Sequence, residues 1–205
     1  MNKGALEDRY AKIEITKLIE RFSIKRIIET GTYKGWSTKE FATLCDNIDT
    51  IEINLEYIED AYEFLKDVTN VKIHNGSSPE VMKNIISNGE KNLLIFLDAH
   101  WENYWPVKDE LNVLIEKNIR PVICIHDFFV PGGNIFVDKY GRRTQSNDGS
   151  KFGYDQYNGV ALDLNYITEE LNKLYPEGFD YHYSSQVSEV DSGLIFIYPK
   201  KHDNI

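Results

Sequence analysis

Residues 26–38 read RIIETGTYKGWST, and they decide the expected fold. Ile27 and Ile28 are β-branched and suit a short buried strand. Gly31 and Gly35 allow backbone angles, and a close approach of neighbouring chain, that a Cβ atom would block. The stretch therefore predicts a buried strand followed by a glycine turn.

A helix is expected directly after this turn, with Ser37 or Thr38 as its N-cap. The N-terminus of such a helix presents free N–H groups that can bind an anion. No Gly-Lys-Ser/Thr closes the stretch, as it would in a nucleoside-triphosphate loop, and the full G-x-G-x-x-G spacing is missing too. The pattern predicts a cofactor loop at the carboxyl end of the first strand, with a plain strand-to-helix turn as the alternative.

The composition is that of an ordinary soluble domain. The chain has 205 residues, 41% of them hydrophobic and 27% charged, which allows a substantial core. Its formal net charge of -10 opposes binding to a nucleic-acid backbone and to an anionic membrane surface. No apolar run approaches the roughly 20 residues that span a bilayer, and the charged N-terminus lacks the apolar core of a signal peptide. We expect no nucleic-acid or membrane partner and a cytoplasmic location.

Strand and helix patterns alternate along the rest of the chain. Apolar residues recur every three to four positions over residues 5–22, which predicts an amphipathic helix over the sheet or the cofactor mouth. Short apolar runs predict strands at about 25–30, 49–53, 70–74, 93–97, 121–125, 179–184 and 194–198. Helices are expected at about 37–46, 55–68, 107–118 and 159–174, and another one is capped by Ser78 with Pro79 at its first position. This alternation predicts a doubly wound, mostly parallel α/β sheet with helices on both faces.

Residues 128–158 interrupt the pattern. They are rich in glycine and aromatic residues, show no clear periodicity, and are too many for a simple connection. We expect residues 1–205 to form a single domain with this segment as a lid insertion, in which 132–156 are mobile without ligand and protected with it. The Arg142-Arg143 pair suggests an anionic group on the substrate, with a solvated loop tip as the alternative.

Polar residues lie at or just beyond the carboxyl ends of five predicted strands: Glu29, Glu52, Asn75, Asp98 and Asp127. These ends meet at one edge of a parallel sheet, so we expect the side chains to line one site. Glu52 follows Gly31 by 21 residues, which is the position of an acid that binds ribose hydroxyls. The same geometry serves nicotinamide dinucleotides and S-adenosylmethionine, and a solvated acid is the alternative.

Several segments together resemble the class I S-adenosylmethionine-dependent methyltransferases. They are Glu29-Thr30-Gly31 with Gly35, Ile51-Glu52, Asn75-Gly76-Ser77 and Phe96-Leu97-Asp98-Ala99-His100-Trp101. The resemblance covers nearly the whole chain, and residues 193–198 look like the family's antiparallel last strand. Within the class, the stretch from the fourth to the fifth strand is most similar to the metal-dependent small-molecule O-methyltransferases, including the catechol and macrolide-sugar types. A Rossmann-like methyltransferase fold is implied.

The resemblance implies S-adenosylmethionine as the cofactor and assigns residues to its parts. Glu29 and Gly31, with Gly35 in the same turn, are assigned to the methionine end, Ser37 to its carboxylate, Glu52 to the ribose and Ser77 to the adenine, and Asp98 is included among the cofactor-binding residues. An anion-binding helix terminus near the carboxylate and acids near the sulfonium cation both suit the charges of this cofactor.

A metal site is also implied by the resemblance. Asp98 and Asp127 would be two ligands of Mg²⁺ or another divalent metal. The catechol type has Asn after the second acid, whereas Phe128 here cannot ligate a metal, so His126 or His100 would have to supply the third position. Histidine favours transition metals over Mg²⁺. A structural acid pair without a metal is the alternative.

His100 is the preferred general base, and with Asp98 it makes up the expected catalytic set. Its ordinary pKa of about 6.5 suits proton abstraction near neutrality. The alternative is a histidine that is hydrogen-bonded to a neighbouring loop. Trp101, Tyr104 and Trp105 follow closely and predict either an aromatic wall for the acceptor or core packing.

These residues predict methyl transfer from S-adenosylmethionine to a hydroxyl group of a small polar acceptor, with or without a metal. Two alternatives stay open. One is a nicotinamide-dependent oxidoreductase, which the acid after the second strand permits and the incomplete glycine fingerprint opposes. The other is a degenerate methyltransferase fold used only for binding. The expected partner is the small-molecule acceptor, and the oligomeric state stays open, a dimer included.

Overall fold

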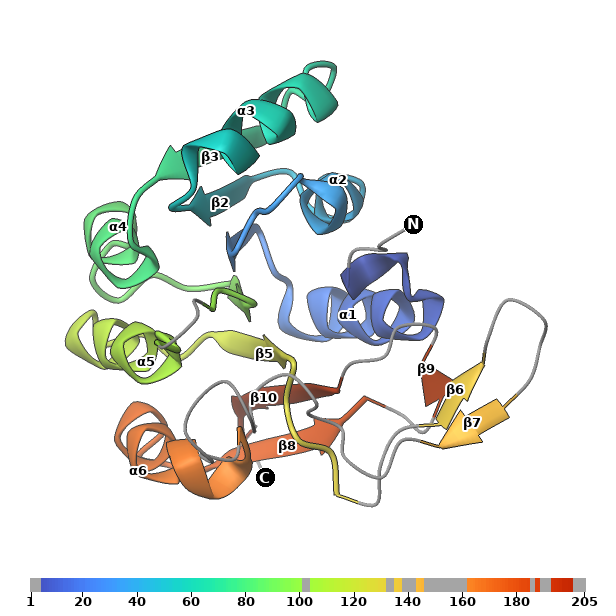
Figure 1. The fold of residues 1–205 in the computed structure, drawn as a ribbon. Coiled ribbons are helices and arrows are strands. Elements are labelled where there is room, and N and C mark those ends of the chain that lie inside the picture. Colours follow the sequence, from blue (N-terminus) through green and yellow to red (C-terminus); the bar gives the residue numbers. More distant parts are fainter. Residues whose placement is uncertain are drawn as a thin grey trace.

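The computed structural model describes residues 5–100, 104–131, 135–137, 143–145, 162–184, 187–188 and 193–200. Its centre is a seven-stranded sheet in the order β3-β2-β1-β4-β5-β10-β8 (Figure 1). The strands are β1 (Arg26–Thr30), β2 (Ile48–Glu52), β3 (Val71–Asn75), β4 (Leu93–Leu97), β5 (Val122–His126), β8 (Phe179–Tyr183) and β10 (Leu194–Pro199). Strand β10 is antiparallel to β5 and β8, and the other pairs are parallel. The predicted mostly parallel sheet with an antiparallel C-terminal strand is confirmed.

Helices cover both faces of this sheet, as the sequence predicted. They are α1 (Arg9–Phe22), α2 (Trp36–Ala42), α3 (Leu55–Phe64), α4 (Ser78–Ile85), α5 (Val107–Glu116) and α6 (Leu164–Leu174). Figure 1 shows α1 and α2 on one side of the sheet and α4, α5 and α6 on the other, with α3 beside the β3 end. The chain is therefore doubly wound.

The strands carry a core on each face. Ile27 packs with Phe41 of α2 on one side, and its neighbour Ile28 packs with Leu111 of α5 on the other. Successive side chains of a strand point to opposite faces, so one strand serves both cores. Every residue of β4 is buried, which explains why its sequence is a continuous apolar run. Each large apolar side chain buried in this way contributes about 1.5–3 kcal/mol.

The N-terminal segment forms a short 3-10 helix, Ala5–Glu7, and then α1. The side chain of Asp8 caps α1 by accepting a hydrogen bond from the Tyr10 N–H at 2.9 Å. The buried side chains of α1, Ala11, Ile15 and Leu18, join the core that also contains Phe41. Of the two predicted positions, over the sheet or over the cofactor mouth, the helix takes the one over the sheet.

Two predicted helix caps were wrong by one to three residues. The N-cap of α2 is Gly35, in the left-handed region at φ 81°, so Ser37 and Thr38 lie inside the helix. The N-cap of α4 is Ser77 rather than Ser78, which places Pro79 second in the helix. Glycine can start α2 because it adopts positive φ without steric cost, and Pro is tolerated in the first turn because those N–H groups have no intrahelical partner.

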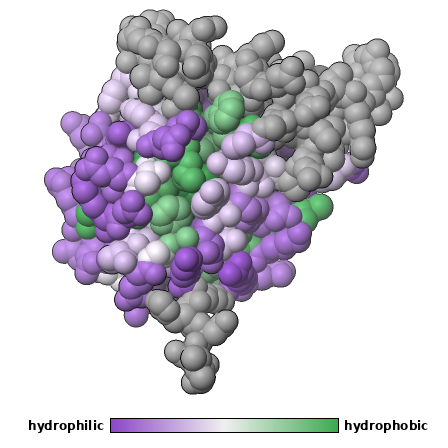
Figure 2. Space-filling model, turned by 90° about the horizontal axis from the view of Figure 1, so that it is seen from below, coloured by the Kyte–Doolittle hydropathy of each residue, from purple (hydrophilic) through white to green (hydrophobic). Residues whose placement is uncertain are grey.

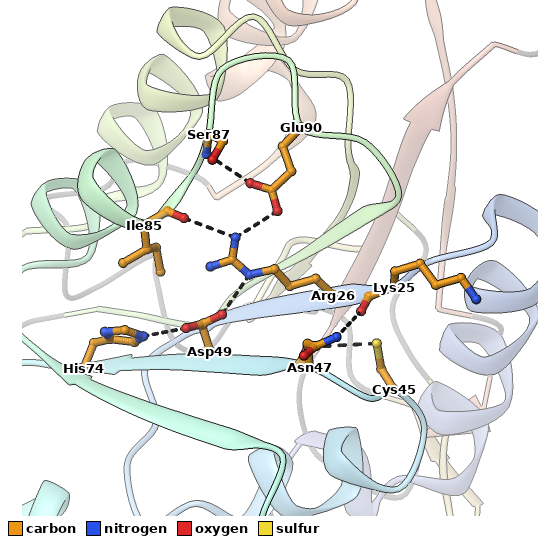
Figure 3. A network of polar contacts seen from close by, with 9 residues as sticks. All are labelled: Lys25, Arg26, Cys45, Asn47, Asp49, His74, Ile85, Ser87 and Glu90. Carbon is orange, nitrogen blue, oxygen red and sulfur yellow. Dashed lines mark hydrogen bonds and ion pairs between the residues drawn. The ribbon is translucent and has the colours of Figure 1, made fainter.

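A closed polar network holds the amino edge of the sheet (Figure 3). Arg26 on β1 donates from Nε to Asp49 Oδ2 at 2.8 Å and from Nη1 to Glu90 Oε1 at 2.8 Å. Its Nη1 also donates to the Ile85 carbonyl at 3.1 Å, and His74 Nε2 lies 2.6 Å from Asp49 Oδ1. One guanidinium thereby ties the segment between α4 and β4 to β1 and β2.

The predicted lid insertion falls mostly outside the described residues. At its start, Phe128 and Val130 are buried in the core. Further along, β6 (Ile135–Val137) pairs with β7 (Arg143–Gln145) and with β9 (Val187–Ser188) in a small second sheet. The mobility expected for 132–156 and the role suggested for Arg142 and Arg143 stay predictions.

The surface is polar over most of the view in Figure 2, with a strip of hydrophobic residues in its middle. This view looks at the molecule from below Figure 1, the side where that figure places α6 and β8. Among the helices of the described residues, none has both the length and the apolar character that crossing a bilayer requires.

Candidate active site

The carboxyl ends of β1, β2, β4 and β5 bring the predicted site residues to one edge. The strands are in register there: Thr30 at the end of β1 faces Ile51 on one side and Leu97 on the other, and Leu97 faces Ile125. The residues that directly follow these strand ends are therefore close to one another in space. Ligands of open α/β sheets bind at this edge, where strand order reverses between β1 and β4.

Gly31 packs the first turn against the end of β4. Its φ is +84°, and a Cβ atom at this position would lie 2.6 Å from the Asp98 carbonyl oxygen. On the other side, Gly31 N–H donates to the Ile51 carbonyl at 2.9 Å, while Asp98 N–H donates to the Thr30 carbonyl at 3.1 Å. Only glycine fits here, because any side chain would push the two segments apart. The predicted cofactor loop and the predicted catalytic acid are thus in direct backbone contact.

Gly35 fixes the other end of the turn. Its φ is +81°, and a Cβ atom would lie 2.9 Å from Leu65 Cδ1, so the start of α2 packs closely on the segment after α3. Ser37, buried in the first turn of α2, lies where the N–H groups of the helix are free of intrahelical partners.

Glu29 lies beneath the glycine turn and is 1% exposed. Its Oε2 accepts hydrogen bonds from the hydroxyls of Thr38 on α2 and, at 2.7 Å, Thr50 on β2. Burial raises the pKa of Glu29 to about 8, against the lowering effect of these two hydroxyls. The carboxyl is therefore mostly protonated at neutral pH, and it ties α2 to the sheet from below.

Glu52 fastens two turns together. Its Oε2 accepts a hydrogen bond from Tyr33 N–H at 2.8 Å, and its Oε1 accepts from Ile53 N–H at 3.0 Å and Asn54 N–H at 2.9 Å. A carboxylate has about four acceptor positions, so these three bonds leave one for a ligand hydroxyl. The sequence placed Glu52 at the edge, but its bond to the glycine turn came only from the fold.

Ser77 ends the turn after β3, and its side chain makes no capping hydrogen bond to α4. The preceding Gly76 has φ +145° and lies close to Val81. This turn stands at the same edge as Glu52, because the last residues of β2 and β3, Glu52 and Asn75, are paired.

Acids and histidines meet at the ends of β4 and β5. His126 Nδ1 lies 2.9 Å from Asp98 Oδ1 and 3.4 Å from Asp127 Oδ1, and His100 Nε2 lies 3.6 Å from Asp127 Oδ2. The side chains of His126 and Asp127 are 11% exposed, against 20% for Asp98 and 37% for His100. All four residues that the sequence singled out here lie in one cluster, which we call the acid–histidine cluster.

Charges within the cluster shift its titration. Burial lowers the pKa of His126, but Asp98 and Asp127 outweigh burial and hold this pKa well above its ordinary value. Burial raises the pKa of Asp98, and the charge of Asp127 adds to this, while His126 opposes it. The two acids therefore favour the protonated form of the His126 ring.

The backbone turns sharply at Asp127 and carries Phe128, whose side chain has no donor atom, away from the cluster. Asp127 has φ 54°, in the left-handed region, which is uncommon for a residue other than glycine. The turn leaves Phe128 fully buried, with its N–H donating to the Gly193 carbonyl at 3.0 Å. Among the two histidines that could replace it, His126 is the one in contact with both acids.

The three ligand atoms fit a divalent metal as well as an ion-paired network. One atom each from Asp98, His126 and Asp127 lies within 4.8 Å of the others. Adjacent ligands of an octahedral ion lie about 3 Å apart when each is about 2.1 Å from the metal. The 2.9 Å between His126 Nδ1 and Asp98 Oδ1 suits either arrangement. A set of one nitrogen and two oxygens suits a first-row transition metal.

The two described aromatic residues after β4, Tyr104 and Trp105, contact different parts of the protein. Trp101 lies outside the described residues. Tyr104 is exposed and donates a hydrogen bond to Asp109, and Trp105 stacks on Tyr166 of α6 with ring centroids 5.3 Å apart. An aromatic wall for the acceptor stays a prediction.

No family model and no curated protein sequence matches the chain. Solved structures do: a candidate caffeoyl-CoA O-methyltransferase from Staphylococcus aureus superposes with a TM-score of 0.58 at 18% identity over 94% of this chain and 84% of that one. The O-methyltransferase TomG from Streptomyces achromogenes, involved in tomaymycin synthesis and solved with S-adenosylmethionine, gives 0.57 at 13% identity over 93% and 79%. A candidate rRNA methylase from Clostridium thermocellum gives 0.56 at 12% identity over 97% and 98%.

Likeness at these identities shows the fold. The chain has the Rossmann-like fold of the class I S-adenosylmethionine-dependent methyltransferases, and several of its structural neighbours are described as O-methyltransferases. The resemblance inferred from the sequence is confirmed at this level.

Proposed function

We propose that this chain is an S-adenosylmethionine-dependent methyltransferase that acts on a hydroxyl group of a small polar acceptor. The observation that carries the proposal is the position of Asp98. Its backbone packs against Gly31 in the predicted cofactor loop, and its carboxylate lies 2.9 Å from His126 in the acid–histidine cluster. A methyl donor held by the loop would then face the groups that can handle an acceptor hydroxyl.

The cofactor would lie along the carboxyl edge from β1 to β3. Its methionine end would rest on Gly31 and Gly35, with its carboxylate at the α2 N-terminus near Ser37. Glu52 would accept a ribose hydroxyl at its remaining acceptor position, and Ser77 would lie beside the adenine. Glu29, buried under the loop, would act indirectly by holding α2 through Thr38.

Methyl transfer needs the acceptor oxygen about 3 Å from the methyl carbon and in line with the carbon–sulfur bond. The oxygen–carbon bond forms as the carbon–sulfur bond breaks, and the electron pair stays on sulfur in S-adenosylhomocysteine. The hydroxyl proton must leave to a base. His100 would accept it at Nδ1, because its Nε2 lies toward Asp127.

Asp98, Asp127 and His126 would hold a divalent metal if the enzyme uses one. Such a metal would lower the pKa of the acceptor hydroxyl and fix its oxygen. Without a metal, the protonated form of His126, which the two acids favour, would supply the positive charge between them, and Asp98 and Asp127 would keep its ring in place.

An acidic chain suits a small acceptor better than a nucleic acid. The net charge of -10 gives no excess of Lys and Arg to neutralise phosphates. Because one structural neighbour is described as a candidate rRNA methylase, RNA belongs in the acceptor panel as a comparison.

The first test is titration calorimetry with S-adenosylmethionine and S-adenosylhomocysteine. We expect saturable binding, and absence of binding at millimolar ligand would overturn the proposal. The second is methyl transfer to catechols, sugars, polyols and RNA. Turnover on RNA alone would contradict the small acceptor, and binding without turnover on any acceptor would favour a degenerate fold.

The metal is tested with the same assay in excess chelator. Loss of activity that added Mg²⁺ or Mn²⁺ restores would establish the metal-assisted form. Full activity in chelator would leave the ion-paired form, with His100 as base.

A further inference from the structure

Strand β8 is the outermost strand of the seven-stranded sheet on the side of β10 (Figure 1). It pairs with β10 without interruption, from Phe179 opposite Pro199 to Tyr183 opposite Ile195. Within the described residues, no further strand pairs with its outer side. An open edge of this kind offers a row of backbone N–H and C=O groups to another strand.

The hydrogen bonds at the two ends of the β8–β10 pair show which backbone groups of β8 point outward. Ser184 N–H donates to the Leu194 carbonyl at 2.8 Å, and Lys200 N–H donates to the Gly178 carbonyl at 3.2 Å. In an antiparallel pair, a strand is hydrogen-bonded to its partner at every second residue. The backbone groups that face away from β10 therefore belong to Phe179, Tyr181 and Tyr183.

Strand β8 lacks the features that usually keep a sheet edge from pairing. Its sequence, FDYHY, contains no Lys, Pro or Gly, and its register with β10 has no bulge. Tyr181 at its centre is 43% exposed, and its ring centroid lies 6.3 Å from that of Phe179 and 5.7 Å from that of Tyr183. By contrast, β3 at the opposite edge carries the exposed Lys72, and an edge lysine opposes pairing with another chain. Of the two edges, β8 is the one suited to a partner.

The sequence of β8 is complementary to itself when it is read in the opposite direction. In an antiparallel pair of two copies centred on Tyr181, Phe179 of each copy would lie opposite Tyr183 of the other, and Asp180 opposite His182. The residues whose backbone groups point outward would then face one another, so each could exchange both hydrogen bonds with its counterpart. Aromatic pairs, and an acid beside an imidazole, are favourable neighbours across two strands.

The side chains of β8 alternate between the two faces of the sheet. Phe179 and Tyr183 pack against the core that includes Leu171 of α6. His182 lies on the α1 face, where its Nε2 is 3.5 Å from Glu14 Oε2. A two-fold axis perpendicular to the sheet keeps like faces together, so the aromatic rings of the two copies would meet on the α6 face.

We propose that β8 is the dimerisation edge of this protein, where two copies pair their β8 strands antiparallel about Tyr181 and join their sheets into one. A second copy fits this edge because its own Asp180 and His182 supply the complementary neighbours. Such an interface is isologous, since both copies use the same residues. The inference concerns assembly and does not depend on the proposed function.

The first test is sedimentation equilibrium of the full chain between about 1 µM and about 100 µM. We expect a dimer with a micromolar dissociation constant. A chain that stays monomeric at about 100 µM would overturn the inference and would leave the edge to a strand of a different protein.

Tyr181→Lys tests whether the dimer uses β8. The substitution would place two ammonium groups directly opposite each other at the two-fold axis, and like charges in that position are destabilising. We expect the dissociation constant of the dimer to rise at least about tenfold. Tyr62→Lys is the matched control, because Tyr62 is 58% exposed on α3, and its dissociation constant should match that of the unmodified protein. Equal dimerisation of Tyr181→Lys and the unmodified protein would overturn the inference.

Tyr181→Cys tests the register and covers the case in which Tyr181→Lys does not fold. Directly opposite, hydrogen-bonded residues have Cα atoms about 5.5 Å apart, which is within the range of a disulfide. Oxidised glutathione should therefore link the two thiols, taking up their two electrons and two protons, and a non-reducing gel should show a covalent dimer. The natural cysteines, Cys45 and Cys124, are buried, and Tyr62→Cys should stay uncoupled. A dimer that does not cross-link through Cys at position 181 would overturn the pairing about Tyr181.

Discussion

The two edges of the sheet use the same kinds of side chain in opposite ways. At the amino edge, Arg26 lies between Asp49 and Glu90, and each charge meets an opposite one at 2.8 Å. At the carboxyl edge, acids outnumber their partners. The closed network at the amino edge fixes a loop to the sheet. The carboxyl edge has acids that are not matched by cations, and these could interact with a ligand.

The pKa shifts follow this division. Burial raises the pKa of Glu29 to about 8 and that of Glu110 to about 7, both at the carboxyl edge. Burying acids without a cation opposes folding. Acids with pKa values shifted by burial are common in active sites, which fits the proposed site at this edge. Four substitutions test this contrast, and they are ordered by the size of the expected free-energy change.

Asp98→Asn should have the largest effect, because it removes the charge that faces His126 and the proposed sulfonium. We expect methyl transfer to fall by about 10³-fold, in the range for lost acid–base and charge stabilisation. Affinity for S-adenosylhomocysteine, measured by calorimetry, should change less than tenfold. Asp180→Asn, an exposed acid on β8, is the control, and full activity of Asp98→Asn would remove the cluster from the chemistry.

Arg26→Leu should cost about 3 kcal/mol of stability, because Asp49 and Glu90 are left without their cation while 10% and 20% exposed. Urea unfolding measures the loss, and cofactor affinity in the folded variant should stay the same. Lys66→Ala breaks a surface pair with Glu63 and should cost close to zero. A loss below about 1 kcal/mol at Arg26 would mean that the amino-edge network does not stabilise the fold.

Glu52→Ala should weaken S-adenosylmethionine binding by about 1.5–3 kcal/mol, the scale of hydrogen bonds to a charged group. Part of the loss would come from the glycine turn, since Tyr33 N–H loses its acceptor. Calorimetry gives the affinity, with Glu56→Ala as a control on the exposed side of the same segment. Unchanged affinity in a folded variant would take Glu52 out of the cofactor site.

Glu29→Gln tests the buried acid through pH. The pKa of Glu29 is raised to about 8 in the fold from 4.5, so its stabilising protonated form is fully present below pH 4.5 and is lost as pH rises toward 8. Gln resembles the protonated form at every pH. Between pH 6 and pH 7 the unmodified protein should lose at most about 1.4 kcal/mol relative to the variant.

Thermal or urea unfolding at both values of pH measures this difference. Because Glu110 is present in both proteins, its own titration cancels. A difference that does not change with pH would show that Glu29 is ionised throughout.

Local patterns predicted much of the fold. The glycine turn, the buried run of β4 and the last strands were all placed within a few residues, because periodicity and turn residues act over short distances. Helix starts at Gly35 and Ser77 were missed, since Ser37 and Ser78 are equally good caps on local grounds. The edge placement of Asp98 and Asp127 followed from the alternation of elements alone.

By itself, the sequence determined the class of fold and the acids and histidines that meet at the carboxyl edge of the sheet, where the site is proposed. Tertiary structure alone decided which of these groups touch. It buried Glu29 under the turn and joined Glu52 to Tyr33. The physical reason is that periodicity depends on neighbours in the chain, whereas these contacts depend on the register of strands and on helices that meet only after the sheet has formed.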